Sequence, residues 1–96
     1  MKGEYCVKIC KFASAGTLES SDVMVDVRPG TGAVEVSVDS VVAAQYGDSI
    51  KATVMEVLQS MEVQDAIVHL SDRGALDCVI RARVETALRR GSEEEA

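Results

Sequence analysis

The sequence is poor in aromatic residues, histidine and proline. Its 96 residues include two tyrosines, one phenylalanine, one histidine, one proline and no tryptophan. A core without large rings must be built from valine, isoleucine, leucine, methionine and alanine, which together with the other apolar residues make up 47% of the chain. Modules that stack nucleobases on exposed rings are disfavoured. The length predicts one domain with a thin core and little room for a deep enclosed active site.

Long apolar runs and cysteine pairs are missing as well. The longest apolar run is 41–44, far short of a membrane span, and charged residues near the N-terminus interrupt any secretory signal. Cys6, Cys10 and Cys78 are an odd number without a CxxC pair, which is typical of reduced thiols. The net charge of −6 disfavours nucleic acid as a partner. We therefore expect a cytoplasmic protein that binds neither membrane nor nucleic acid.

Alternating apolar residues predict strands near 4–11, at 23–28 and at 34–39, and a short β-favouring run predicts another at 66–70. The polar stretch 13–22 predicts a loop, with a short extended piece as an alternative. The turn cluster from Pro29 to Gly32 indicates a β-hairpin between the second and third strands.

Two segments have helical periodicity. The first carries an apolar stripe of Ile50, Val54, Val57, Leu58 and Met61. Ser40 is a candidate N-cap for it, and a kink or restart is expected at Gly47-Asp48. The second is expected from about Ala75 to Arg90, ending at Gly91. Its expected buried residues are Leu76, Val79, Ile80, Val84, Ala87 and Leu88.

The predicted fold is α+β. Each helix has one apolar face, so both should cover one face of a small, mostly antiparallel sheet of about four strands, as a two-layer sandwich. The strand order stays open. Residues 1–90 are expected to form a single domain and 91–96 a disordered acidic tail.

Few residues suggest catalysis. A lone His69 within a strand is more often structural than catalytic, and Cys6 with Cys10 offers too few ligands for zinc. Cys78 is expected to be a small buried residue. Asp72 and Asp77 flank a helix start, where they suit capping. Four arginines of the last helix could dock an acidic subunit or phosphates, although a solvated face is the commoner explanation: Arg81, Arg83, Arg89 and Arg90.

The loop Leu18-Glu19-Ser20-Ser21-Asp22 holds two serines with no histidine nearby in sequence. A serine hydroxyl without a base is a poor nucleophile, but it can accept a group that another enzyme delivers. Judged from the residues alone, an ordinary polar loop remains the commoner explanation.

Three blocks in this sequence resemble the acyl carrier (γ) subunits of citrate lyase. They are Ala15-Gly16-Thr17-Leu18-Glu19-Ser20-Ser21-Asp22-Val23-Met24-Val25, Gln45-Tyr46-Gly47-Asp48-Ser49-Ile50, and Gly74-Ala75-Leu76-Asp77-Cys78-Val79-Ile80-Arg81-Ala82-Arg83-Val84-Glu85. Their order and spacing also fit, so the resemblance spans about Ala15 to Arg90.

The resemblance implies a non-catalytic carrier of the citrate lyase complex. It implies that Ser20 carries, through a phosphodiester, a covalent 2'-(5''-phosphoribosyl)-3'-dephospho-CoA arm whose thiol holds the acetyl or citryl group during cleavage of citrate to acetate and oxaloacetate. The implied partners are an alpha (transferase) subunit, a beta (lyase) subunit and a synthase that loads the arm. Modification of Ser21 instead stays open, as do a carrier of malonate decarboxylase and an unmodified α+β interaction or regulatory module.

Overall fold

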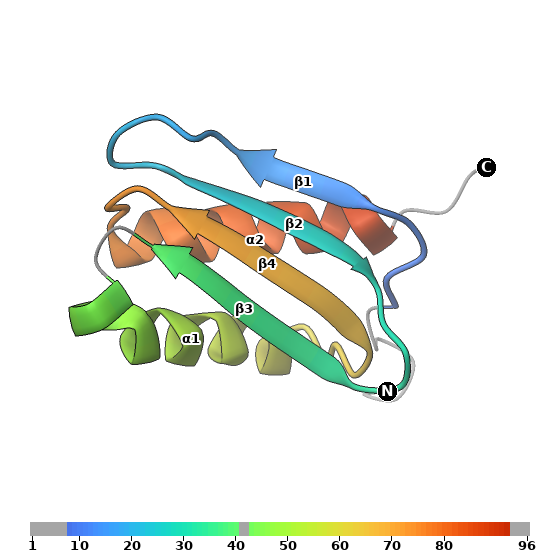
Figure 1. The fold of residues 1–96 in the computed structure, drawn as a ribbon. Helices are drawn as coiled ribbons and strands as arrows, with labels where there is room; N and C mark the ends of the chain where they lie inside the picture. Colours follow the sequence, from blue (N-terminus) through green and yellow to red (C-terminus); the bar gives the residue numbers. More distant parts are fainter. Residues whose placement is uncertain (1–7, 41–42, 93–96) are drawn as a thin grey trace.

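The computed structural model describes residues 8–40 and 43–92, which form four strands and two helices (Figure 1). Along the chain they are β1 (Ala13–Gly16), β2 (Val23–Pro29), β3 (Val34–Ser40), α1 (Ala43–Ser60), β4 (Ala66–Asp72) and α2 (Asp77–Ser92). The α+β class is confirmed, and the order of element types agrees with the prediction, although the first strand lies at a different place in the sequence.

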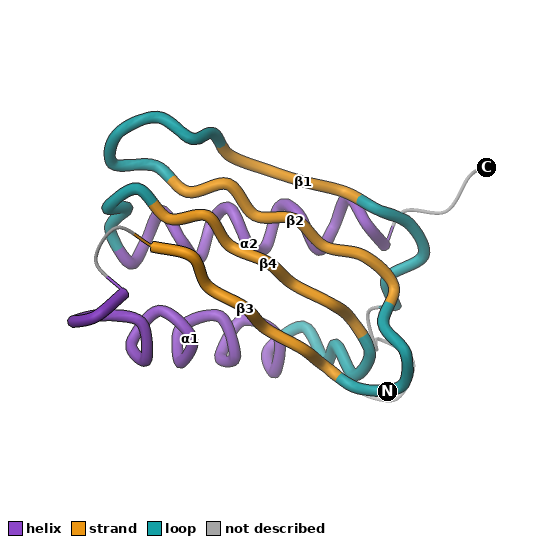
Figure 2. The backbone as a smooth tube through the Cα atoms, viewed as in Figure 1, coloured by secondary structure: helices purple, strands orange, loops and turns teal. Residues whose placement is uncertain are grey.

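The strands make one open sheet in the order β1-β2-β4-β3 (Figure 2). Strand β2 is antiparallel to both β1 and β4, whereas β3 is parallel to β4. The parallel pair is joined through α1, as a parallel connection requires. The sheet is therefore mixed, with two antiparallel pairs and one parallel pair.

The expected hairpin between β2 and β3 is wrong, because β4 lies between these strands. Every second side chain of β4 is almost fully buried, namely those of Ala66, Val68 and Leu70, and such a strand gains most from a central position. The connection after β2 instead passes the start of β4. There the amide of Gly32 donates to Oδ1 of Asp65 at 3.0 Å.

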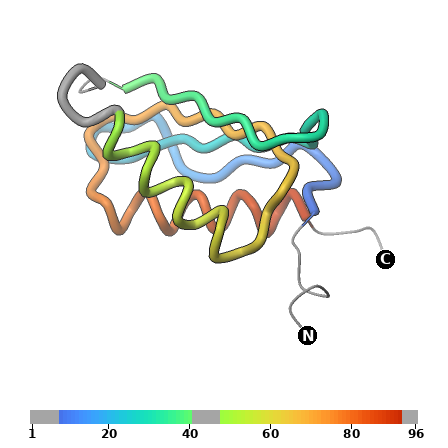
Figure 3. Tube along the Cα trace, turned by 90° about the horizontal axis from the view of Figure 1, so that it is seen from below, coloured from blue at the N-terminus to red at the C-terminus, as the bar shows by residue number. Residues whose placement is uncertain are grey.

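Both helices cover the same face of the sheet, and the two layers are visible edge-on in Figure 3. Helix α1 packs against β3, and α2 packs against β1 and β2. The core between the layers is aliphatic, as the composition predicts. Its fully buried members, with 0% exposure, are Val23, Val25, Val27, Val54, Ala66, Val68, Leu70, Val84, Ala87 and Leu88.

The helix boundaries differ from the expectations in three places. Helix α1 runs through Gly47 without a break, whereas Ser40, the candidate N-cap, is the last residue of β3 and donates its hydroxyl to Asp72. Helix α2 starts at Asp77, so Leu76 precedes it and is 70% exposed where burial was expected. The same helix continues past the expected stop at Gly91 to Ser92. The carbonyl of Gly91, at the end of the helix, accepts hydrogen bonds from the amides of Cys10 (2.8 Å) and Lys11 (3.2 Å).

These two bonds also explain why the strand expected near 4–11 is wrong over its described part. Cys10 and Lys11 bond to the end of α2, and residues 8–11 belong to no strand, while Ile9 is buried in the core. The first strand is β1, inside the stretch predicted as a loop. Residues 4–7, which include Cys6, and the tail residues 93–96 lie outside the described residues.

Candidate attachment site

Ser20 lies at the tip of the loop 17–22 that joins β1 to β2. This loop projects at the end of the molecule where β4 ends and both helices begin (Figure 1). The side chains of Ser20 and Ser21 are exposed, and within the described residues neither hydroxyl has a hydrogen-bond partner. The structure thus places the predicted residue where another protein could reach it.

The tip is a tight turn with a defined backbone. The amide of Asp22 donates to the carbonyl of Glu19 at 3.1 Å, which puts Ser20 and Ser21 at its two central positions. Ser21 has φ of 66°, as a turn with a left-handed third residue requires. The amide of Ser21 also donates to the carbonyl of Arg73 at 2.8 Å, whereas Ser20 occupies the apex.

Asp22 holds the base of the loop. Its Oδ2 accepts the hydroxyl of Thr17 at 2.7 Å, and its Oδ1 accepts the amide of Val23 at 2.7 Å. Arg83 donates to both oxygens at 3.1 Å, from Nε and Nη2. These bonds, first that of Thr17 and then that of Val23, with help from Arg83, lower the pKa of Asp22 from 3.8 to about 2. The carboxylate therefore stays ionised at any ordinary pH.

Sequence reasoning missed the roles of Thr17, Asp22 and Arg83. Arg83 was assigned to a solvated helix face, but it is half-buried and ties α2 to the loop. Helical spacing could have predicted that Arg83 lies beside the buried face of the helix. It is three residues after Ile80 and four before Ala87, both of which face the core.

The loop that follows β4 is hydrogen-bonded to the loop 17–22. Arg73 follows β4, and its amide donates to the carbonyl of Asp22 at 2.9 Å while its carbonyl accepts the amide of Ser21. Asp72, 1% exposed, accepts the hydroxyl of Ser40 at 2.8 Å and the amide of Ala75 at 2.9 Å. Asp72 was expected to cap the helix, but it accepts an amide of the turn that precedes α2, which begins at Asp77. Together these bonds extend the pairing of β2 with β4 beyond the sheet.

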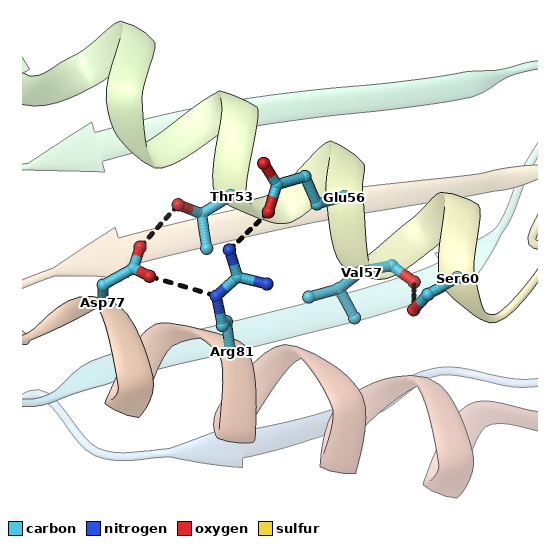
Figure 4. A network of polar contacts seen from close by, with 6 residues as sticks. All are labelled: Thr53, Glu56, Val57, Ser60, Asp77 and Arg81. Carbon is cyan, nitrogen blue, oxygen red and sulfur yellow. Dashed lines mark hydrogen bonds and ion pairs between the residues drawn. The ribbon is translucent and has the colours of Figure 1, made fainter.

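A polar network joins the two helices next to this end of the molecule (Figure 4). Asp77 accepts the hydroxyl of Thr53 at 2.6 Å and Nε of Arg81 at 3.0 Å. Arg81 also pairs with Glu56 of α1. The hydrogen bond from Thr53, followed by that from Arg81, lowers the pKa of Asp77. The network connects the helices, and we assign it a structural role.

The other candidates do not gather around Ser20. His69 sits in the middle of β4, where its Nδ1 lies 2.8 Å from the hydroxyl of Ser37. Cys78 is exposed, so its expected burial is wrong; Cys10 is exposed too. Within residues 8–40 and 43–92, no three metal-ligating side chains cluster. In the same ranges no helix is long and apolar enough to cross a membrane.

Comparison with known proteins first defines the class. Residues 11–91 match a family model of acyl carrier proteins described as "Malonate decarboxylase delta subunit (MdcD)". A chain in the crystal structure of a Pseudomonas malonate decarboxylase hetero-tetramer in complex with malonate superposes with a TM-score of 0.72 over 88% of each chain. At 18% identity this likeness shows the fold alone.

Closer relatives narrow the class. The citrate lyase acyl carrier protein of Cronobacter sakazakii is 49% identical over 87 residues, which cover 91% of this chain and 90% of that protein. That of Haemophilus influenzae (strain PittEE) is 50% identical over 88 residues, covering 92% of each. The chain belongs to the citrate lyase acyl carrier protein family. It is a carrier subunit and not a catalytic one.

Proposed function

We propose that this chain serves as the acyl carrier subunit of a citrate lyase and that Ser20 is its attachment point. The observation that carries the proposal is the position of Ser20. Its exposed hydroxyl, unpartnered within the described residues, stands at the apex of a braced turn in a chain of this family. We further propose that the attached group is 2'-(5''-phosphoribosyl)-3'-dephospho-CoA, joined to the serine oxygen through a phosphodiester.

The residues around Ser20 fit such a group. The hydroxyl has no internal hydrogen bond to lose on esterification, and the turn exposes it for a loading enzyme. The anionic Asp22 is already neutralised by Arg83, which limits repulsion of an added phosphate. Arg73, next to the loop, has an exposed side chain with no partner among the described residues. A guanidinium suits phosphate oxygens particularly well.

When bound, the arm supplies a thiol that can hold an acyl group as a thioester. The chain itself supplies the anchor. A braced turn keeps the attachment point in one place, so that the tethered thiol remains at high effective concentration near the sites of its partners. We propose an alpha (transferase) and a beta (lyase) subunit of citrate lyase as these partners, a synthase as the loading enzyme, and the cytoplasm as the compartment.

Loading of purified variants tests the site. We expect the synthase to add one arm to the wild-type protein and to the matched control Ser21→Ala, and none to Ser20→Ala. All three proteins should share one melting temperature, because both serines are exposed and support no core packing. Loading of Ser20→Ala, or failure of a folded Ser21→Ala, would transfer the assignment to Ser21.

Malonate decarboxylase remains the second candidate, because the matching family model bears its name. Reconstitution separates the two. The loaded chain should restore citrate cleavage to citrate lyase subunits from the same host and should not restore decarboxylation to malonate decarboxylase subunits. The opposite pattern would favour the second candidate.

A further inference from the structure

A groove opens beside the loop that carries Ser20. It has a volume of about 350 Å³ and lies between the first half of α1 and the start of α2. Its apolar walls come from Ile50, Ala75, Leu76 and Ile80, and Ser49 and Asp77 add polar edges. Leu76 is 70% exposed although it is a large apolar side chain that lines this groove.

The groove and the loop are connected through Arg73. The carbonyl of Arg73 accepts the amide of Ser21 at 2.8 Å, and the next residue, Gly74, lines the groove. The guanidinium of Arg73 is exposed and unpartnered within the described residues. The residue whose backbone connects the attachment loop to the groove therefore carries a positive charge, in a chain whose net charge is −6.

We propose that the groove binds the adenosine part of the arm attached to Ser20, with Arg73 next to the phosphodiester. This inference rests on the proposed function. In the arm, the phosphoribosyl link joins the 2'-position of the adenosine ribose, so adenosine is the part nearest to Ser20 and the thiol is the farthest. The flat adenine ring offers apolar faces to the aliphatic walls and polar edges to Ser49.

The size of the groove fits a nucleoside better than it fits the whole arm. Pockets for entire small-molecule ligands span about 300–1,000 Å³, and this one lies at the lower end. Binding the nucleoside orders only the near half of the arm. The far half, which ends in the thiol, stays free to enter the active sites of partner subunits. Because the near half is bound in the groove, the free half leaves the protein surface from one fixed point.

Nuclear Overhauser effects in the loaded, isotope-labelled protein test the proposal directly. Intact mass first establishes that the arm is present on Ser20. We then expect contacts between the adenine protons and the methyl groups of Ile50 and Leu76. Leu76→Asp should abolish them, and the fold should survive because Leu76 is exposed. The matched control Met55→Asp, an exposed apolar residue of α1 outside the groove, should retain them.

The phosphorus resonance of the phosphodiester tests Arg73. It should shift in Arg73→Gln and stay unchanged in Arg28→Gln, an exposed arginine at the far end of β2. An unchanged resonance in Arg73→Gln would contradict the role given to this residue.

These experiments distinguish failure of the attachment to Ser20 from failure of adenosine binding in the groove. An unmodified Ser20 would overturn the proposed function, and the groove proposal with it. A loaded Ser20 whose adenine signals are sharp and show no contact with the groove would overturn the groove proposal alone. If, in that case, Leu76→Asp weakened assembly with the partner subunits, the groove would be a docking surface for them.

Discussion

At the scale of single residues, the site depends on a few groups that give an exposed loop a fixed backbone. Thr17, Asp22 and Arg83 form its base, and the backbone of Arg73 holds its second half. The sequence did not predict this arrangement, because Arg83 is 61 positions from Asp22 and no local pattern links the two residues. The sequence located the loop and its serines; only the tertiary structure shows what braces them.

The ionised Asp22 makes stability depend on pH. Its pKa falls from 3.8 to about 2 on folding, so its contribution is complete well above pH 3.8 and is lost as the pH falls toward 2. Asp22→Asn should therefore destabilise the protein at pH 7, and its deficit should shrink between pH 4 and 2. Urea unfolding across this range measures the difference. Asp48→Asn, at an exposed site of α1 without partners among the described residues, is the control. A deficit that is constant down to pH 2 would contradict the account.

Gly16, at the entrance to the loop, should not tolerate a side chain. Its φ is 97°, and a Cβ would lie 1.8 Å from the carbonyl oxygen of Val23. Gly32 has a comparable φ of 115° but open space around it. Gly32→Ala should cost about 1 kcal/mol in strain, and Gly16→Ala clearly more, about 3 kcal/mol or above, because β1 must also move. Equal unfolding free energies for the two variants would refute the close approach.

At the scale of elements, period-two and helical patterns in the sequence predicted most strands and helices. These patterns did not predict which strands pair with each other. Strands β2 and β3 look like a hairpin because a short turn joins them, yet β4 separates them. The central position in the sheet goes to the strand whose side chains are most deeply buried. All inward residues of β4 have 0 or 1% exposure. Strand β1 was expected only as a short extended piece, the alternative to a loop, because its four residues, ASAG, are small and lack alternation.

The contact between the helices rests on Thr53 more than on the exposed ion pair. Thr53 is 6% exposed and donates to Asp77, so Thr53→Val should cost about 1 kcal/mol. Glu56→Gln, which affects only the exposed pair with Arg81, should cost less than about 0.5 kcal/mol. Thr86→Val, at a threonine of α2 that has no such bond to the described residues, controls for the substitution itself. Chemical denaturation ranks the three, and a larger loss in Glu56→Gln would reverse the assignment.

At the scale of the whole molecule, the features to which we assign a function gather at one end. The loop with Ser20, the end of β4 and the starts of both helices lie together there (Figure 1). The groove is lined by residues of the first half of α1 and the start of α2. The two-layer architecture was predictable from one apolar face on each helix. The groove was not, because Leu76 was expected in the core, whereas α2 begins one residue later and leaves it exposed.

The central claim, that Ser20 carries the arm, is tested most directly by intact mass and peptide mapping of the protein purified from citrate-grown cells of its native host. The account predicts a single adduct with the mass of a phosphoribosyl-dephospho-CoA group, confined to the peptide that contains Ser20 and located on that serine by fragmentation. An unmodified protein from cells that cleave citrate with their other subunits present would contradict it, and would favour an unmodified interaction module.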